Sequence, residues 1–150
     1  MAKYDQEMAQ RVWKRVQGEQ SREQPERNLQ GLILGEWMAA STYLMLSRQM
    51  GPKEAEILRR MFREEQNHAA CLKGMYVLST GQKPVIRTPQ PSKEPVEATL
   101  RRCYSAELQS VAEYEARSGD PEFGHVFARM ARQEREHCAY VLELIGSLHK

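Results

Sequence analysis

The sequence has few of the residues that mark several common protein classes. Its three cysteines, Cys71, Cys103 and Cys138, are odd in number and form no Cys-x-x-Cys pair. This excludes a disulfide scaffold and a rubredoxin-type or zinc-ribbon metal knot. No run of about 18 uncharged apolar residues occurs, so we expect no membrane-spanning helix. The first residues lack the apolar core of a secretory signal, and we therefore expect a cytoplasmic protein.

An excess of charge of one sign is also lacking. The chain of 150 residues has 22 Lys and Arg against 20 Asp and Glu, which gives a net charge of +2. A strongly basic surface for nucleic acid or for an anionic membrane is therefore excluded, and we expect neither as a partner. With 28% charged and 41% hydrophobic residues, the composition is typical of a folded domain.

Glycine and proline are sparse and gather at a few breaks, with long uninterrupted segments between them. These segments are rich in Ala, Leu, Met, Glu, Gln and Arg, which are good helix formers. Sustained alternation of β-branched and aromatic residues is absent, so a sheet is not expected. The pattern predicts four core helices, at about residues 28–49, 53–79, 94–118 and 121–148.

The connections between these helices are unequal in length. Two are short turns, where Pro52 and Pro121 suit the first turn of a helix and Asp120 suits an N-cap. The middle connection, residues 80–93, holds three prolines. If extended, it can reach ~45 Å, the length of a helix of about 25 residues. We therefore predict an all-α, ferritin-like four-helix bundle, made of two antiparallel hairpins joined by a long crossover.

The bundle is assigned to residues 28–150, and residues 1–27 form a separate polar arm. Tyr4, Met8 and Val12 recur at helical spacing in the arm, which predicts a short amphipathic helix. We interpret this helix as packing on the bundle or on a second copy of the chain, with a docking peptide as the alternative.

The two predicted hairpins repeat each other. A shift of 69 residues aligns 52–72 with 121–141, and seven positions are identical. In the first helix of each hairpin the shift is 71 residues. Each hairpin therefore carries Glu-x6-Tyr followed by Glu-x-x-His. The repeated residues are Glu36, Tyr43, Glu65 and His68 in the first hairpin and Glu107, Tyr114, Glu134 and His137 in the second.

Every Glu and His of this repeat lies within an apolar stripe of its helix. Residues 32–46, for example, contain Glu36 as their single charged residue. Such stripes face the core of a bundle, so four carboxylates are predicted to be buried with only two imidazoles. Burying them costs many kcal/mol unless cations compensate, and no Lys or Arg lies on the stripes. Bound metal is the economical explanation.

The spacing of these residues fits a metal centre. Glu and His of Glu-x-x-His lie one helical turn apart, so both can reach one ion. One Glu from each of two helices and Glu-x-x-His from each of the other two make up the dinuclear carboxylate set of helix bundles. Oxygen and imidazole ligands suit iron or manganese. The predicted ligands are Glu36, Glu65, His68, Glu107, Glu134 and His137.

These motifs resemble the ferritin-like superfamily. GEWMAASTY and AELQSVAEY are similar to its Glu-x6-Tyr helices, and FREEQNHAA and ARQEREHCA to its Glu-x-x-His helices. The resemblance covers residues 28–148 and is greatest to the rubrerythrin-like branch that lacks a rubredoxin domain. It implies two iron ions per chain, with Glu36 and Glu107 as terminal ligands and Glu65 and Glu134 as bridging, catalytic carboxylates.

The resemblance also implies a reaction and its partners. Hydrogen peroxide or dioxygen is reduced in protection against oxidative stress, with electrons from an external electron-transfer protein, and the chain is expected to form a homodimer. Tyr43 and Tyr114 are expected to donate hydrogen bonds to ligand carboxylates and to assist catalysis. The chain departs from rubrerythrins at Ser110, where they have a further Glu. Two alternatives remain open, a ferritin-type ferroxidase that binds iron and a di-iron hydroxylase.

Overall fold

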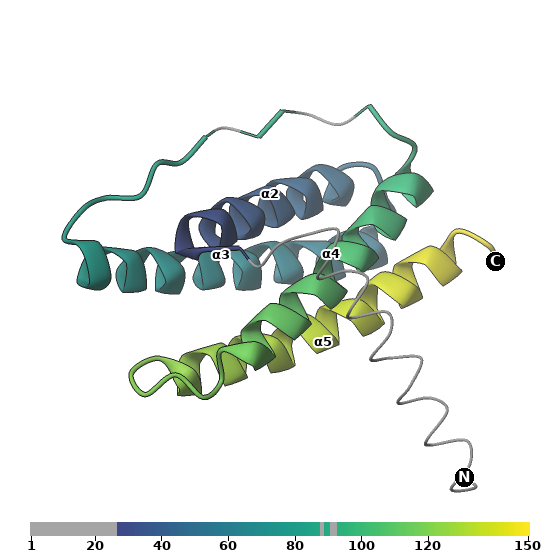
Figure 1. Ribbon diagram of the computed structural model, residues 1–150. Coiled ribbons are helices and arrows are strands. Elements are labelled where there is room, and N and C mark those ends of the chain that lie inside the picture. The colour runs from purple at the N-terminus through teal and green to yellow at the C-terminus, as the bar shows by residue number, and fades with distance from the viewer. Residues whose placement is uncertain (1–26, 88, 91–92) are drawn as a thin grey trace, which may run out of the picture.

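The computed structural model describes residues 27–87, 89–90 and 93–150, which contain four α-helices and no strand (Figure 1). The all-α, four-helix class expected from the sequence is confirmed. The predicted arm, residues 1–27, lies outside the described residues except for Arg27. Within the described ranges no helix is long and apolar enough to cross a membrane. The helices are α2 (Leu29–Ser47), α3 (Pro52–Thr80), α4 (Val96–Ala116) and α5 (Gly124–Ser147).

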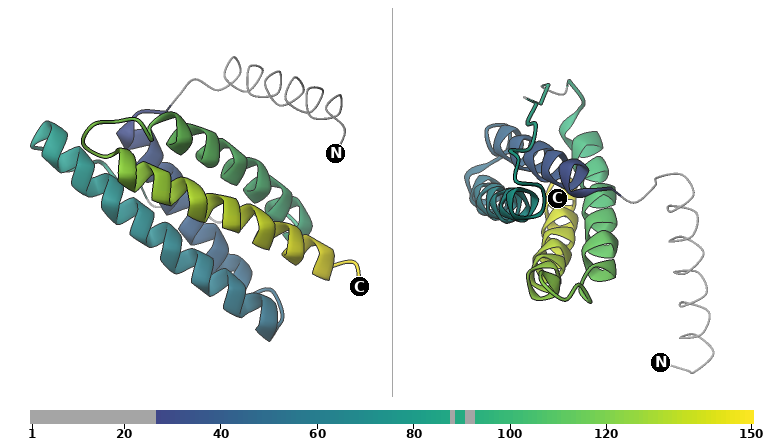
Figure 2. Two further views of the ribbon diagram at one scale, coloured as in Figure 1. Left: turned by 90° about the horizontal axis from the view of Figure 1, so that it is seen from below. Right: turned by 60° about the vertical axis from the view of Figure 1, so that its left-hand side comes forward.

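The four helices form two hairpins, as expected. Helix α2 packs along α3 and α4 packs along α5, and the hairpins meet through α3 and α5 (Figures 1 and 2). The crossover leaves the end of α3 and runs past α2 to the start of α4 (Figure 1). Gln30 on α2 holds the crossover, because its side-chain oxygen accepts from the Val85 N–H at 3.1 Å and its amide donates to the Val85 carbonyl.

Short-range features define where α2 begins and where α3 begins and ends. The Asn28 side chain accepts from the Gly31 N–H at 2.9 Å and caps α2. Pro52 lies in the first turn of α3, where its missing N–H breaks no helical hydrogen bond. Helix α3 ends at Gly81, whose φ of 70° is the left-handed conformation that glycine adopts without strain.

Helix α5 begins three residues later than predicted, at Gly124 rather than Pro121. The Asp120 carboxylate does accept from backbone N–H groups, those of residues 122 and 123, but these close a turn and not the first turn of α5. The chain then passes so close to itself that a Cβ on Gly124 would lie 2.3 Å from the carbonyl oxygen of Ser118. A side chain at position 124 would therefore clash with the backbone of the turn, and glycine permits this path.

The core consists of two apolar clusters related by the sequence repeat. The polar residues of the repeat lie between the clusters, and Tyr43 and Tyr114 each belong to one of them. A polar layer is thus enclosed at both ends by apolar side chains. The first cluster contains Leu32, Ile33, Leu72, Met75, Tyr114, Phe127, Met130 and Ala131, and the second contains Tyr43, Leu46, Leu58, Met61, Leu100, Cys103, Val141 and Leu144.

Candidate metal centre

The structure brings all six predicted ligands together at the centre of the bundle. The buried, apolar face of each helix supplies the predicted ligands. Helices α2 and α4 supply one carboxylate each, and helices α3 and α5 each supply one carboxylate and one imidazole. None of the six residues is more than 2% exposed. The six residues are Glu36, Glu65, His68, Glu107, Glu134 and His137.

The ligands form two overlapping groups, each able to hold a metal ion. Within each group one ligand atom per residue lies within 4.8 Å of all the others. Glu65 and Glu134 belong to both groups. They are therefore placed to bridge two ions, while Glu36 with His68 and Glu107 with His137 complete one position each.

The donor atoms at the centre fit a metal pair. One oxygen of each of the four carboxylates and the Nδ1 atoms of both imidazoles are buried and face one another, with no hydrogen-bond partner outside this cluster. Buried polar atoms are normally paired, so each of these atoms is open to a ligand. The Nδ1 atom of His68 lies 3.0 Å from Glu134 Oε1, and that of His137 lies 2.7 Å from Glu65 Oε1. Carboxylate and imidazole donors this close together could hold a metal ion.

Tyr43 and Tyr114 each hold the carboxylate of the opposite hairpin. The Tyr43 hydroxyl donates to Glu107 Oε1 at 2.5 Å, and the Tyr114 hydroxyl donates to Glu36 Oε1. Burial, and then the nearby carboxylate, raises the pKa of both phenols well above 10.0. Both tyrosines therefore keep their protons and act as donors that fix the outer oxygen of each carboxylate.

Two residues that the sequence analysis did not identify hold the outer nitrogens of the histidines. Glu64 Oε2 lies 2.7 Å from His137 Nε2, and Gln133 Oε1 lies 2.6 Å from His68 Nε2. Each contact spans from α3 to α5. By accepting the Nε2–H, these residues leave Nδ1 of each ring as the donor that faces the centre. The signal in the sequence was their position, since each directly precedes a repeated Glu.

The site is strongly negative without a cation, and its pKa values reflect this. Burial lowers the pKa of His68, but hydrogen bonds and charges from Glu134 and Glu36 outweigh it and raise that pKa from 6.5 to about 10. For His137, burial is likewise outweighed, here chiefly by Glu107 and Glu134, and the pKa rises to about 12. Both rings thus carry protons at neutral pH in the absence of metal.

The pKa values of the buried carboxylates shift in opposite directions. Burial, and then the charge of Glu134, raises the pKa of Glu65 and of Glu107 well above 4.5. Burial also raises the pKa of Glu134, but hydrogen bonds from His137 and His68 outweigh it and hold that pKa well below 4.5. The site therefore favours a cation at its centre, whether a proton or a metal ion.

A cavity of about 180 Å³ lies between α2 and α4 and reaches the ligands Glu65, Glu107 and Glu134. Small residues make room for it, and Arg27 and Arg102 lie at its edge. Its remaining lining includes Gly35, Met38, Ala39, Thr42, Tyr43, Cys103, Ala106 and Ser110. The cavity therefore places open space directly beside three of the six predicted ligands.

Arg27 lines this cavity between α2 and α4 and forms an ion pair there. Its guanidinium binds Glu113 on α4 with its Nε 3.0 Å from Oε2, and it lies so near Gly35 that a Cβ there would be 2.2 Å from Nη1. Glu113 is itself buried and accepts a further hydrogen bond from Gln109 at 2.7 Å. Sequence reasoning missed this pair, because Arg27 was assigned to the arm.

The cysteines have packing roles in the described structure. All three thiols are free, and Cys103 and Cys138 are buried. Burial raises the pKa of Cys103 to about 12 and that of Cys138 to about 11, so both remain thiols. Cys103 belongs to an apolar cluster and also lines the cavity.

Comparison with known proteins adds no assignment, since no family model, no curated protein and no solved structure matches this chain. The resemblance to ferritin-like proteins therefore stays a prediction that rests on the motifs.

Proposed function

We propose that this chain is a di-iron carboxylate oxidoreductase of rubrerythrin-like type. The observation that supports it is the pair of overlapping ligand groups, whose six inward atoms are buried with no hydrogen-bond partner outside the cluster. Four carboxylates balance the charge of two divalent ions, and the oxygen and imidazole donors suit iron, with manganese as the alternative metal. In this proposal the substrate is hydrogen peroxide or dioxygen.

Each ligand has a distinct role in the proposed centre. Glu65 and Glu134 would be shared by the two ions, because they belong to both groups. Glu36 and Glu107 would each hold one ion, and the tyrosine that binds each carboxylate leaves its other oxygen free for metal. Bound iron would supply the electrons and the Lewis acidity that reduction of an O–O bond requires.

The protein's own groups control access and protons. The apolar clusters exclude water from both ends of the centre, and the α2–α4 cavity admits a small oxidant. Reduction of one hydrogen peroxide to two waters consumes two electrons and two protons. An external electron-transfer protein would then return two electrons to the oxidised centre. The hydroxyl protons of Tyr43 and Tyr114 orient the terminal carboxylates throughout.

One observation also favours a second candidate, a di-iron hydroxylase. The cavity beside Glu65, Glu107 and Glu134 has a largely apolar lining, as a small organic substrate would require. At about 180 Å³ it limits such a substrate to a small molecule.

Rapid kinetics of iron oxidation tests the proposal. The purified chain is loaded anaerobically with Fe(II), mixed with hydrogen peroxide or dioxygen, and followed by stopped-flow absorbance. We expect uptake that saturates near about two irons per chain and oxidation that is much faster with peroxide.

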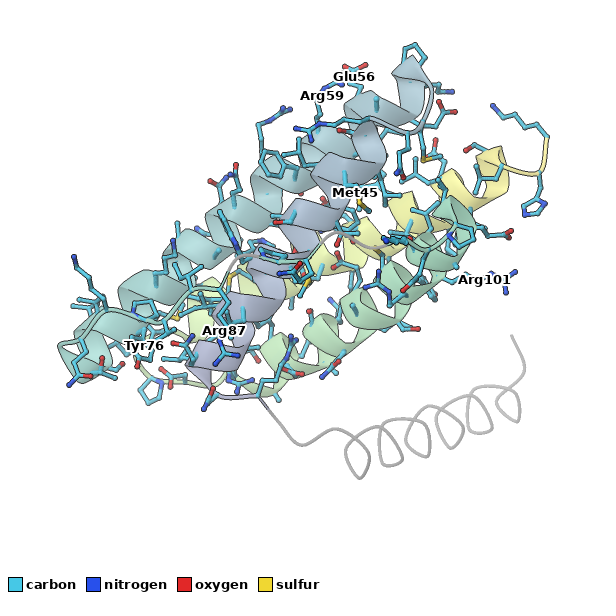
Figure 3. The ribbon with its side chains drawn as sticks, turned by 90° about the horizontal axis from the view of Figure 1, so that it is seen from above. Met45, Glu56, Arg59, Tyr76, Arg87 and Arg101 are labelled. Atoms are coloured by element: carbon cyan, nitrogen blue, oxygen red, sulfur yellow. The ribbon has the colours of Figure 1, made fainter. Side chains whose placement is uncertain are left out.

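The other outcomes separate the alternatives. Faster oxidation by dioxygen would favour the hydroxylase or a ferroxidase, and uptake well beyond saturation would indicate ferritin-type storage. No saturable uptake would rule out the iron centre. Glu56→Gln is the matched control, because Glu56 is an exposed glutamate on α3 that projects away from the bundle (Figure 3).

A further inference from the structure

The sequence repeat is broken at one functional pair, Glu64 and Gln133. A shift of 69 residues makes them equivalent, and each reaches across the bundle to the outer nitrogen of a histidine. The carboxylate of Glu64 holds His137, whereas the neutral amide of Gln133 holds His68. The ligands themselves and the two tyrosines are matched across the repeat.

This difference changes the donor strength of the two rings. A carboxylate that accepts the Nε2–H increases the electron density at Nδ1 and adds a negative charge near the ion. An amide oxygen orients the ring equally well, but it carries no net charge. Loss of such an outer partner typically weakens metal binding by about 10–100-fold.

A neighbouring arginine does not cancel the difference. Arg60 Nε lies 3.2 Å from Glu64 Oε1, but the Arg60 side chain is 57% exposed, so solvent screens its charge. Glu64, at 16% exposure, contacts the ring directly. The equivalent arginine in the other half, Arg129, contacts the Cys71 thiol at 3.8 Å instead.

We propose that Glu64 and Gln133 make the two metal positions unequal, so that the position with His137 binds its ion more tightly than the position with His68. The inference rests on the proposed metal centre. The first ion then occupies the group of Glu65, Glu107, Glu134 and His137, and the second completes the group of Glu36 and His68. Glu64 and Gln133 act as positioning residues, since each works through a histidine.

Stepwise metal titration of the full chain tests this inference without any turnover. The probe is Co(II), added anaerobically and followed by its visible absorption and by calorimetry. Repulsion between two ions separates the steps even at equal sites, so variants are required. Glu64→Gln gives both rings an amide, and Gln133→Glu gives both a carboxylate.

The variants have distinct expected results. We expect the ratio of the two dissociation constants to narrow by about tenfold or more in both variants. Glu64→Gln should narrow this ratio by weakening the binding of the first ion. Gln133→Glu should narrow it by strengthening the binding of the second ion. The double variant, which carries both Glu64→Gln and Gln133→Glu, should restore the wide ratio of dissociation constants. Glu56→Gln is the control in which this ratio should not change.

Failure of the inference is distinguishable from failure of the proposed function. Two bound ions with a ratio that neither variant alters would overturn the inequality and leave the metal centre intact. The absence of saturable binding of any divalent metal by the wild-type chain would instead overturn the centre itself, and the inference with it.

Discussion

At the scale of residues, the centre concentrates charge that the fold alone does not neutralise. Burying a carboxylate costs several kcal/mol unless a cation compensates, and four are buried here at 2% exposure or less. Two imidazoles that face them supply at most two positive charges when protonated. Two divalent ions would balance all four carboxylates and leave the imidazoles neutral.

The histidines predict how metal binding depends on pH. Without metal, the pKa values of about 10 for His68 and about 12 for His137 keep both rings protonated at pH 7. Metal must displace these protons, so a higher pH favours binding. We expect the apparent affinity to rise about tenfold per pH unit for each displaced proton. Titration in weak buffer with a pH indicator should record at least about two protons released per metal pair. Binding that weakens as pH rises, or that releases no proton, would contradict this.

The sequence predicts the six ligands, and the family resemblance predicts the two tyrosines that bind them, but neither predicts Glu64 and Gln133. Glu36 and Glu107 stand out because a charge interrupts an apolar stripe, which periodicity detects. Periodicity shows only on which face of its own helix a residue lies. Glu64 and Gln133 are partly exposed residues that reach across to another helix, and no pattern within one helix encodes that contact.

At the scale of helices, α2 and α4 pack less closely against each other than against their hairpin partners, α3 and α5. Across the α2–α4 seam, small side chains, Gly35, Ala39, Ala106 and Ser110, leave a cavity that reaches the ligands. Ser110 is the position where the rubrerythrin-like resemblance would place a further glutamate. The shorter side chain leaves room for the guanidinium of Arg27, which lies 3.5 Å from its hydroxyl.

A larger residue in the cavity between α2 and α4 should restrict the access of the oxidant to the metal ions without removing those ions. Ala106 lines the cavity and is exposed, so Ala106→Leu fills space without disturbing the core. We expect oxidation of loaded iron to slow about tenfold, equivalent to ~1.4 kcal/mol on the barrier, with unchanged metal content. Stopped-flow absorbance measures the rate, and Ala116→Leu, exposed on the same helix, is the control. Equal rates in both variants would show that the oxidant takes another route.

The helices themselves are largely predictable, and their ends less so. Helical periodicity and the prolines of the crossover predicted both hairpins and the connection between them. The start of α5 was misplaced because Asp120 and Pro121 are also suited to a tight turn. The close approach of Gly124 to Ser118 decides between the two, and it depends on the folded path of the chain.

At the scale of the whole molecule, the centre is shared between the two hairpins. Each ligand group takes residues from both, since Glu134 joins three ligands from α2 and α3, and Glu65 joins three from α4 and α5. Metal binding would therefore link the hairpins through their interior, where direct packing runs mainly between α3 and α5. The site and the fold thus depend on each other.

The number of metal ions bound per chain tests the central claim most directly. The wild-type chain, Glu65→Gln and the control Glu56→Gln are loaded anaerobically with Fe(II), freed of unbound metal by gel filtration and analysed for iron. We predict about two ions in the wild type and the control, and loss of the pair in Glu65→Gln, since Glu65 belongs to both ligand groups. A Glu65→Gln chain that retains both ions, or a wild-type chain that retains none, would contradict the account.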